Sequence, residues 1–120
     1  MAPPLNPEAM KSFFVYVTAA DAAEAERIGR TAVGERLAAC ANILDGMRSL
    51  YWWQGRLEEA QETVLILKTT NERLDALIAR VRALHSYDCP CIEALEVVAG
   101  NPDYLAWLAR ETRPAEGQPS

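Results

Sequence analysis

Residues 40–70 read CANILDGMRSLYWWQGRLEEAQETVLILKTT, and this stretch decides the fold. Its two halves, 40–53 and 57–70, are rich in aromatic, aliphatic and β-branched side chains, which favour strands. Gln54-Gly55 lies between them and is a turn signal, so the two strands are predicted to form a long hairpin. Asp45-Gly46 interrupts the regular pattern of the first strand.

In the sequence, a strand and a helix are predicted before the hairpin, and a helix and a strand after it. Residues 12–18 form an apolar run typical of a central strand, and residues 92–99 predict a fourth strand. Asp21 and Glu24 have the spacing of a capping box, which predicts a helix at about 21–37. After the hairpin, Asn71 is the expected cap of a helix whose apolar residues repeat at helical spacing. That apolar stripe consists of Leu74, Leu77, Ile78, Val81 and Leu84.

The order of elements is therefore β-α-β-β-α-β, followed by a short helix. Asn101-Pro102 begins this last helix, which ends before Pro114. Two split β-α-β units joined by a hairpin make an α+β, ferredoxin-like sandwich with the first and third strands in the centre. We expect one domain at residues 12–112, with disordered tails at 1–11 and 113–120.

Composition and charge narrow the class of protein. Lys+Arg is 12 and Asp+Glu is 17, and this acidic balance argues against a nucleic-acid partner. The odd count of three cysteines excludes a complete intrachain disulfide framework and favours a reducing compartment. The N-terminus has no secretory pattern, and no stretch has the length of a membrane span. We expect a soluble, cytoplasmic protein with no membrane partner.

The second strand ends in three aromatic residues, Tyr51, Trp52 and Trp53, and it is an edge strand in this topology. A long aromatic edge without Lys or Pro invites pairing with another chain. Neighbouring residues on a strand point to opposite faces, so all three cannot fold back over their own sheet. The pattern favours a homo-oligomer joined through hairpin edge strands, with packing over the chain's own sheet as the alternative.

Residues 84–95, LHSYDCPCIEAL, hold the only histidine, His85, and two cysteines, Cys89 and Cys91. Imidazole and thiolate ligands suit Cu(I) or Zn(II), and in an extended segment Cys89 and Cys91 point to one face. The alternative is a histidine at a helix end and two small thiols packed at a strand start. A Cys89–Cys91 disulfide would be strained, and Cys40, in an apolar run, is expected to be a buried thiol.

Other polar residues offer weaker candidates. Glu58, Glu59 and Glu62 could form an oxygen-rich cation surface or simply a solvated face. Lys68 could hold an anion in an intersubunit cleft or extend to solvent at a strand end. One histidine without a serine or cysteine partner, and no phosphate-binding loop, indicate that the chain is not an enzyme.

Several separated motifs in order resemble the CutA family of divalent-cation-tolerance proteins. They are GERLAACANI at 34–43, SLYWWQGRLEE at 49–59, LILKTT at 65–70, LHSYDCPCI at 84–92 and the PDYLAWL ending at 108. The resemblance covers about residues 13–112 and implies a ferredoxin-like homotrimer, loosely similar to PII-type signalling proteins and associated with copper and other divalent cations. The family pattern can have a cysteine at Val17 and a histidine at Leu84, and it has proline at Ser86 and glutamate at Cys91. Only His85 carries over from the family's copper site.

Two functional hypotheses follow. In the first, a cytoplasmic homotrimer supports copper tolerance by binding metal ions through His85, Cys89 and Cys91. In the second, a PII-like sensor or scaffold binds a small molecule or a protein in its intersubunit clefts. The expected cleft residues are Tyr51, Trp52, Trp53, Lys68 and Tyr87.

Overall fold

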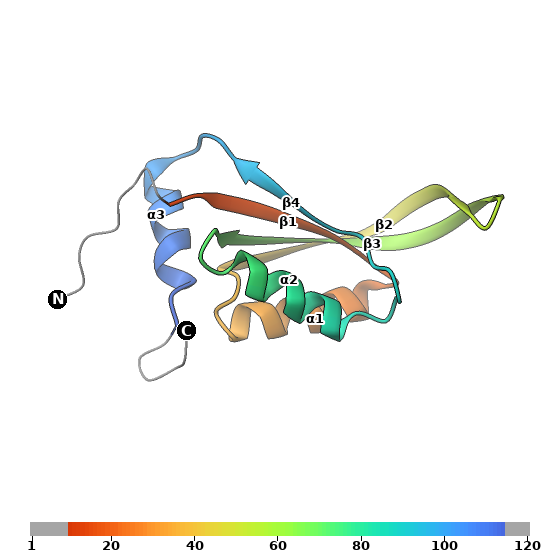
Figure 1. Ribbon diagram of the computed structural model, residues 1–120, viewed down its shortest axis with the longest axis horizontal. Coiled ribbons are helices and arrows are strands. Elements are labelled where there is room, and N and C mark those ends of the chain that lie inside the picture. Colours follow the sequence, from red (N-terminus) through yellow and green to blue (C-terminus); the bar gives the residue numbers. More distant parts are fainter. Residues whose placement is uncertain (1–9, 115–120) are drawn as a thin grey trace.

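The computed structural model describes residues 10–114 as one four-stranded antiparallel sheet in the order β2-β3-β1-β4, with helices α1 and α2 covering one face (Figure 1). This arrangement confirms the predicted α+β, ferredoxin-like order, with β1 and β3 in the centre. The predicted tails, 1–11 and 113–120, lie almost wholly outside the described residues. The elements are β1 (Ser12–Ala19), α1 (Ala22–Gly34), β2 (Cys40–Trp53), β3 (Arg56–Thr70), α2 (Leu74–Leu84), β4 (Ile92–Val97) and α3 (Pro102–Glu111).

The hydrophobic core lies between the sheet and helices α1 and α2. Alternation along β1 sends Val15, Val17 and Ala19 into this core, where they are fully buried. Helix α1 approaches the sheet closely at Gly29, because a Cβ atom there would come within 3.2 Å of the Ala41 Cβ. The remaining buried core residues include Ile28, Leu65, Leu67, Leu77 and Val81.

The helix ends agree with the sequence only in part. The predicted capping interaction of α1 is present, because Asp21 Oδ1 accepts a hydrogen bond from the Glu24 N–H at 2.8 Å. The helix ends at Gly34 instead of residue 37, since Arg36 takes a left-handed conformation with φ of 61°. The prediction that Asn71 caps α2 is wrong. Arg73 occupies the N-cap position without a side-chain cap, and Asn71 Oδ1 accepts from the Lys11 N–H.

Strands β2 and β3 form a hairpin that extends beyond the two helices (Figure 1). Gln54 and Gly55 both have positive φ, 51° and 78°, as a two-residue type I′ turn requires. The interruption expected at Asp45-Gly46 is a β-bulge between Leu44 and Met47, with Gly46 at φ 79°. Because the hairpin leaves the body of the domain, its side chains find few partners within the chain.

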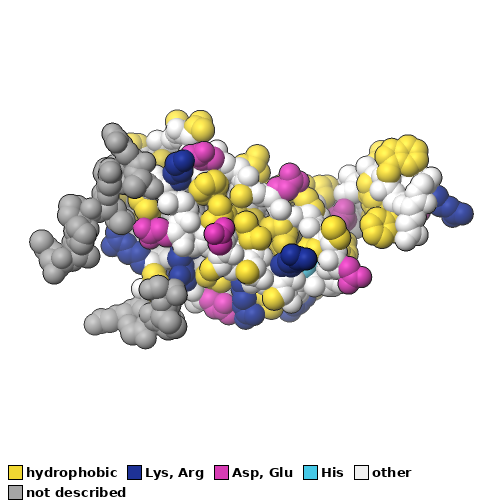
Figure 2. Space-filling model, in the orientation of Figure 1, with side chains coloured by type: hydrophobic (Ala, Val, Ile, Leu, Met, Phe, Trp, Pro, Cys, Tyr) yellow, Lys and Arg dark blue, Asp and Glu magenta, His cyan; other side chains and the backbone are white. Residues whose placement is uncertain are grey.

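The free end of the hairpin exposes large aromatic side chains. Trp52 is 74% exposed and Trp53 is 57% exposed. Figure 2 shows hydrophobic side chains gathered at this end, away from the helices. Within residues 10–114, no helix has the length and apolar character needed to cross a membrane.

Candidate functional site

A pocket of about 410 Å³ lies between the projecting hairpin and the loop that joins α2 to β4. It is called the thiol pocket here because two cysteines line it. Its lining residues are Thr18, Tyr51, Trp53, Glu62, Tyr87, Asp88, Cys89 and Cys91.

Three segments of the chain bring these residues together: β1, which supplies Thr18, the β2–β3 hairpin, and the loop between α2 and β4. In the hairpin, Tyr51 pairs with Glu58 and Met47 pairs with Glu62, so Tyr51, Trp53 and Glu62 share one face by strand alternation. This face of the sheet is the one that α1 and α2 do not cover. Thr63, the neighbour of Glu62, is buried and pairs with the core residue Ala19, so Glu62 points to the opposite face. The loop supplies Tyr87 to Cys91, and the Tyr87 hydroxyl donates to Glu62 Oε2 at 3.1 Å, which joins the loop to the hairpin.

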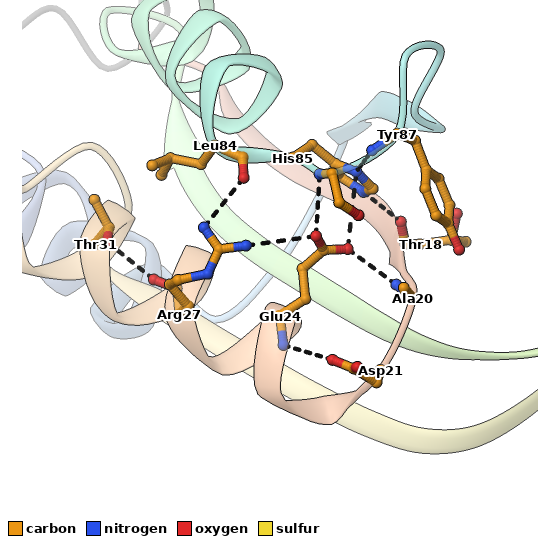
Figure 3. Close-up of polar contacts among 10 residues, drawn as sticks. Thr18, Ala20, Asp21, Glu24, Arg27, Thr31, Leu84, His85 and Tyr87 are labelled. Atoms are coloured by element: carbon orange, nitrogen blue, oxygen red, sulfur yellow. Dashed lines mark hydrogen bonds and ion pairs between the residues drawn. The ribbon is translucent and has the colours of Figure 1, made fainter.

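A buried carboxylate fastens the start of this loop to α1 (Figure 3). Glu24 is only 7% exposed. Its Oε1 accepts from the Ala20 N–H at 3.0 Å, and its Oε2 accepts from the Ser86 N–H at 3.0 Å. Arg27 forms an ion pair with Glu24, with 3.5 Å between Arg27 Nη2 and Glu24 Oε2. Its Nη1 donates to the Leu84 carbonyl at 3.2 Å. The end of α2 and the loop after it are therefore held against α1.

His85 lies in the same network and is fully enclosed, with a side-chain exposure of 0%. Its Nε2 lies 2.7 Å from the Thr18 carbonyl oxygen, and its Nδ1 accepts from the Tyr87 N–H at 3.1 Å. A carbonyl can only accept and an amide N–H can only donate, so this pattern places the ring hydrogen on Nε2. Both ring nitrogens are engaged, and a metal could reach one of them only by displacing a hydrogen bond.

Negative charge accumulates around the thiol pocket. Burial and then the neighbouring Glu62 raise the pKa of Tyr87 to about 12. Burial, together with the hydrogen bond and charge of Glu93, raises the pKa of the Cys91 thiol. The pKa of Tyr16 is raised by burial and by Cys91, Glu62 and Glu93 in turn. Each of these groups therefore keeps its proton to higher pH than usual, and a cation bound nearby would lower its pKa.

The structure gathers some of the predicted site residues and separates others. Cys89 and Cys91, from the metal hypothesis, share the thiol pocket with Tyr51, Trp53 and Tyr87, from the cleft hypothesis. Trp52 points to the opposite face of the hairpin, where it pairs with Leu57. Lys68 lies outside the pocket lining. Its Nζ is 3.2 Å from the Tyr104 hydroxyl and 5.2 Å from the Phe14 ring centroid.

The third cysteine and the other carboxylates stand apart from the pocket. Cys40 is half-buried instead of fully buried, because it begins the edge strand β2, and its Sγ lies 3.9 Å from Asn42 Oδ1. Glu59 forms an ion pair with Arg48 on the exposed hairpin. Of the three hairpin glutamates, only Glu62 lines the thiol pocket.

Comparison with known proteins agrees with this fold. The family model described as CutA1 divalent ion tolerance protein matches residues 13–111. The chain belongs to the CutA1 family. This finding confirms the resemblance seen in the sequence motifs.

Curated and solved CutA1 relatives align over most of the chain. A chloroplastic CutA 1 protein from Oryza sativa is 43% identical over 85% of the chain, which spans only 58% of that relative's length. A divalent-cation tolerance protein CutA from Pyrococcus horikoshii is 43% identical over 82% of the chain and 96% of the relative. The solved divalent cation tolerance protein from Thermus thermophilus superposes with a TM-score of 0.82 at 43% identity, covering 85% of this chain and 99% of that one.

For this CutA1 chain, sequence reasoning missed three contributors to the site. Asp88 lies within the 84–95 stretch but was not named as a candidate, although it lines the pocket. Thr18 was assigned only to a strand, and Glu24 only to a helix cap, yet Glu24 also holds the Ser86 N–H across 62 residues of chain. The acidic residue in the first helical turn was visible, but its partner in a distant loop depends on tertiary packing. Among residues 10–114, no three or more His, Cys, Asp and Glu side chains are grouped to hold a metal ion.

Proposed function

We propose that this CutA1 protein supports divalent-cation tolerance by binding metal ions in the thiol pocket, with copper as the favoured metal. One observation carries the proposal. The pocket is lined by two cysteines, Cys89 and Cys91, and two acidic residues, Glu62 and Asp88, and no lysine or arginine is among its lining residues. A site of this composition attracts cations, and its thiolates favour a soft ion such as Cu(I).

The donor set fits a small thiolate site better than a closed zinc site. A structural zinc ion needs four ligands in a tetrahedron. In the described part of the chain, no group of three or more His, Cys, Asp or Glu side chains is placed to hold a metal ion. Two thiols suffice to anchor a soft monovalent ion. Since burial and Glu93 raise the pKa of Cys91, the metal must displace the thiol proton, and binding should therefore weaken as pH falls.

His85 enters the proposal differently from the two cysteines. Its ring nitrogens hold the Thr18 carbonyl and the Tyr87 N–H, so its first contribution is to set the course of the loop that carries Cys89 and Cys91. A role as a direct ligand would require the ring to give up one of these bonds. Metal affinity of a His85 variant, measured beside its stability, separates the two contributions.

The proposal includes a cytoplasmic, non-enzymatic homotrimer. Leu50, Trp52 and Leu57 lie on one face of the projecting hairpin and are largely exposed in the single chain. Exposed apolar side chains on an edge strand favour pairing with a second copy. Size-exclusion chromatography with light scattering measures the mass of the assembly, and a monomer at micromolar concentration would contradict the proposed trimer.

The proposed cytoplasmic location is supported by the cysteines. Three free cysteines suit a reducing compartment.

The metal proposal is tested by titrating the fully reduced protein with Cu(I) in competition with a chelator. The Cys89→Ser/Cys91→Ser variant should lose stoichiometric binding, because both soft ligands are removed. Cys40→Ser is the matched control, since Cys40 lies outside the pocket, and it should bind like the wild type. Equal binding by all three proteins, or no binding by the wild type, would refute the proposal.

A further inference from the structure

The thiol pocket has a second chemical character that metal binding does not use, because three aromatic side chains form part of its wall. We propose that the pocket binds a small organic cation, a quaternary or protonated amine, against the faces of Tyr51, Trp53 and Tyr87 and beside the carboxylates of Glu62 and Asp88. Aromatic faces attract such cations through their quadrupole, and nearby carboxylates supply the opposite charge. The proposal gives chemical content to a small-molecule role and is independent of the thiols.

The aromatic wall is built by the fold and is exposed in the single chain. Tyr51 and Trp53 are two residues apart on β2, so both side chains stand on the face of the hairpin that carries Glu62. Tyr87 approaches from the loop. It is held by its hydrogen bond to Glu62 and by a tilted contact with the His85 ring, whose centroid lies 4.8 Å from that of Tyr87. Tyr51, Trp53 and Tyr87 are 42%, 57% and 37% exposed, so their rings keep surface that a ligand can cover.

The charge of the pocket selects the ligand class. Glu62 and Asp88 line it, and no basic side chain does, which disfavours anions. The carboxylate of Glu62 also accepts from the Tyr87 hydroxyl, which increases the electron density of that ring and strengthens its attraction for a cation.

The size of the pocket leaves room for a molecule larger than a bare ion. Its volume of about 410 Å³ falls within the range of roughly 300–1,000 Å³ typical of small-molecule sites. A bare metal ion would contact the thiols and carboxylates and leave the three rings uncovered. A compact cation with a methylated or protonated nitrogen would cover the rings and reach the carboxylates together.

Choline is a suitable probe, and 3,3-dimethyl-1-butanol is its uncharged isostere. The chain has three tryptophans, so a Trp52→Phe/Trp107→Phe variant leaves Trp53 as the sole tryptophan reporter. Choline should change the fluorescence of Trp53 saturably, and the isostere should bind at least about tenfold more weakly because it lacks the charge. Isothermal titration of the wild type with both compounds checks the affinities without substitutions.

Adjacent tryptophans provide the matched variants. Trp53→Ala should weaken choline binding about tenfold, whereas Trp52→Ala, on the opposite face of the same strand, should change it by less than about twofold. Glu62→Gln should also weaken binding. Light scattering verifies that Trp53→Ala and Glu62→Gln keep the oligomeric state of the wild type. Choline binding by Trp52→Ala is compared at a protein concentration high enough for its assembly to match that of the wild type.

The cysteine variants separate this proposal from metal binding. Cys89→Ser/Cys91→Ser should retain choline affinity while losing Cu(I), and Trp53→Ala should do the reverse. The organic-cation proposal is overturned if the wild type shows no saturable choline binding below about 10 mM. It is equally overturned if choline and its isostere bind alike, or if Trp52→Ala and Trp53→Ala weaken binding equally.

Discussion

Replacing Glu24 with alanine should destabilise the protein far more than a typical change in the first turns of a helix. In the folded chain the Glu24 carboxylate accepts two backbone hydrogen bonds at 3.0 Å, one from Ala20 before the helix and one from Ser86 in the distant loop. Alanine removes the acceptor and leaves both N–H groups without this partner. The loop that carries the thiol pocket residues also loses its tie to α1.

The expected loss follows from these contacts. Removing a charged acceptor costs about 1.5–3 kcal/mol for each hydrogen bond when the donors are buried. Ala20 and Ser86 are exposed residues, so water replaces part of each bond, and we expect a total loss of about 2–4 kcal/mol. Glu26→Ala is the matched control, two positions along the same helix. The exposed Glu26–Arg30 pair, at 2.9 Å, is worth only about 0.5 kcal/mol.

Urea unfolding at one fixed protein concentration measures both variants, because association would couple stability to concentration. A Glu24→Gln variant adds a test of the charge. Burial opposes ionisation of Glu24, but hydrogen bonds from Ala20 and Ser86 outweigh it, and its pKa is lowered from 4.5. A lowered pKa in the folded state stabilises the protein fully above 4.5, and this contribution is lost as pH falls below it.

The difference in unfolding free energy between the wild type and Glu24→Gln should therefore shrink as pH is lowered from 6 toward 3, about one to two units on either side of the ordinary pKa. A pH-independent difference would mean that the charge of Glu24 is not involved. A loss from Glu24→Ala no larger than that from Glu26→Ala would refute the assignment of this carboxylate as the tie between α1 and the loop.

Three further tests, two of them with a matched control variant, examine the rest of the structure. His85→Ala should cost about 2–4 kcal/mol in urea unfolding, because it leaves the Thr18 carbonyl and the Tyr87 N–H without the imidazole; a loss below about 1 kcal/mol would contradict the buried, doubly bonded ring. Leu65→Ala should cost about 2–5 kcal/mol by opening a cavity under α1, whereas Leu57→Ala on the exposed hairpin should leave the stability of the isolated fold nearly unchanged. Trp52→Ala should shift light-scattering mass toward smaller species at low micromolar concentration, while Tyr104→Ala, an aromatic change outside the hairpin, should not.

Much of the fold was predictable because its information is local. The hairpin turn at Gln54-Gly55, the apolar stripe of α2 and the start of α3 at Asn101-Pro102 each depend on neighbouring residues. The cap of α2 was mispredicted because Asn71 meets Lys11 from the far end of the chain. In the same way, the enclosure of His85 depends on a strand 67 residues away, so spacing alone could suggest a ligand but not show that its nitrogens are already bonded.

The three consecutive aromatics of β2 show how one short motif can serve two purposes. Strand alternation directs Tyr51 and Trp53 toward the thiol pocket and Trp52 toward the opposite, exposed face. Because the hairpin extends beyond the helices, neither face is covered by the chain's own core. The proposed association and the proposed ligand binding should therefore respond separately to substitutions at adjacent positions. A sequence pattern that lists the aromatics together cannot make this distinction, but the register of the hairpin does.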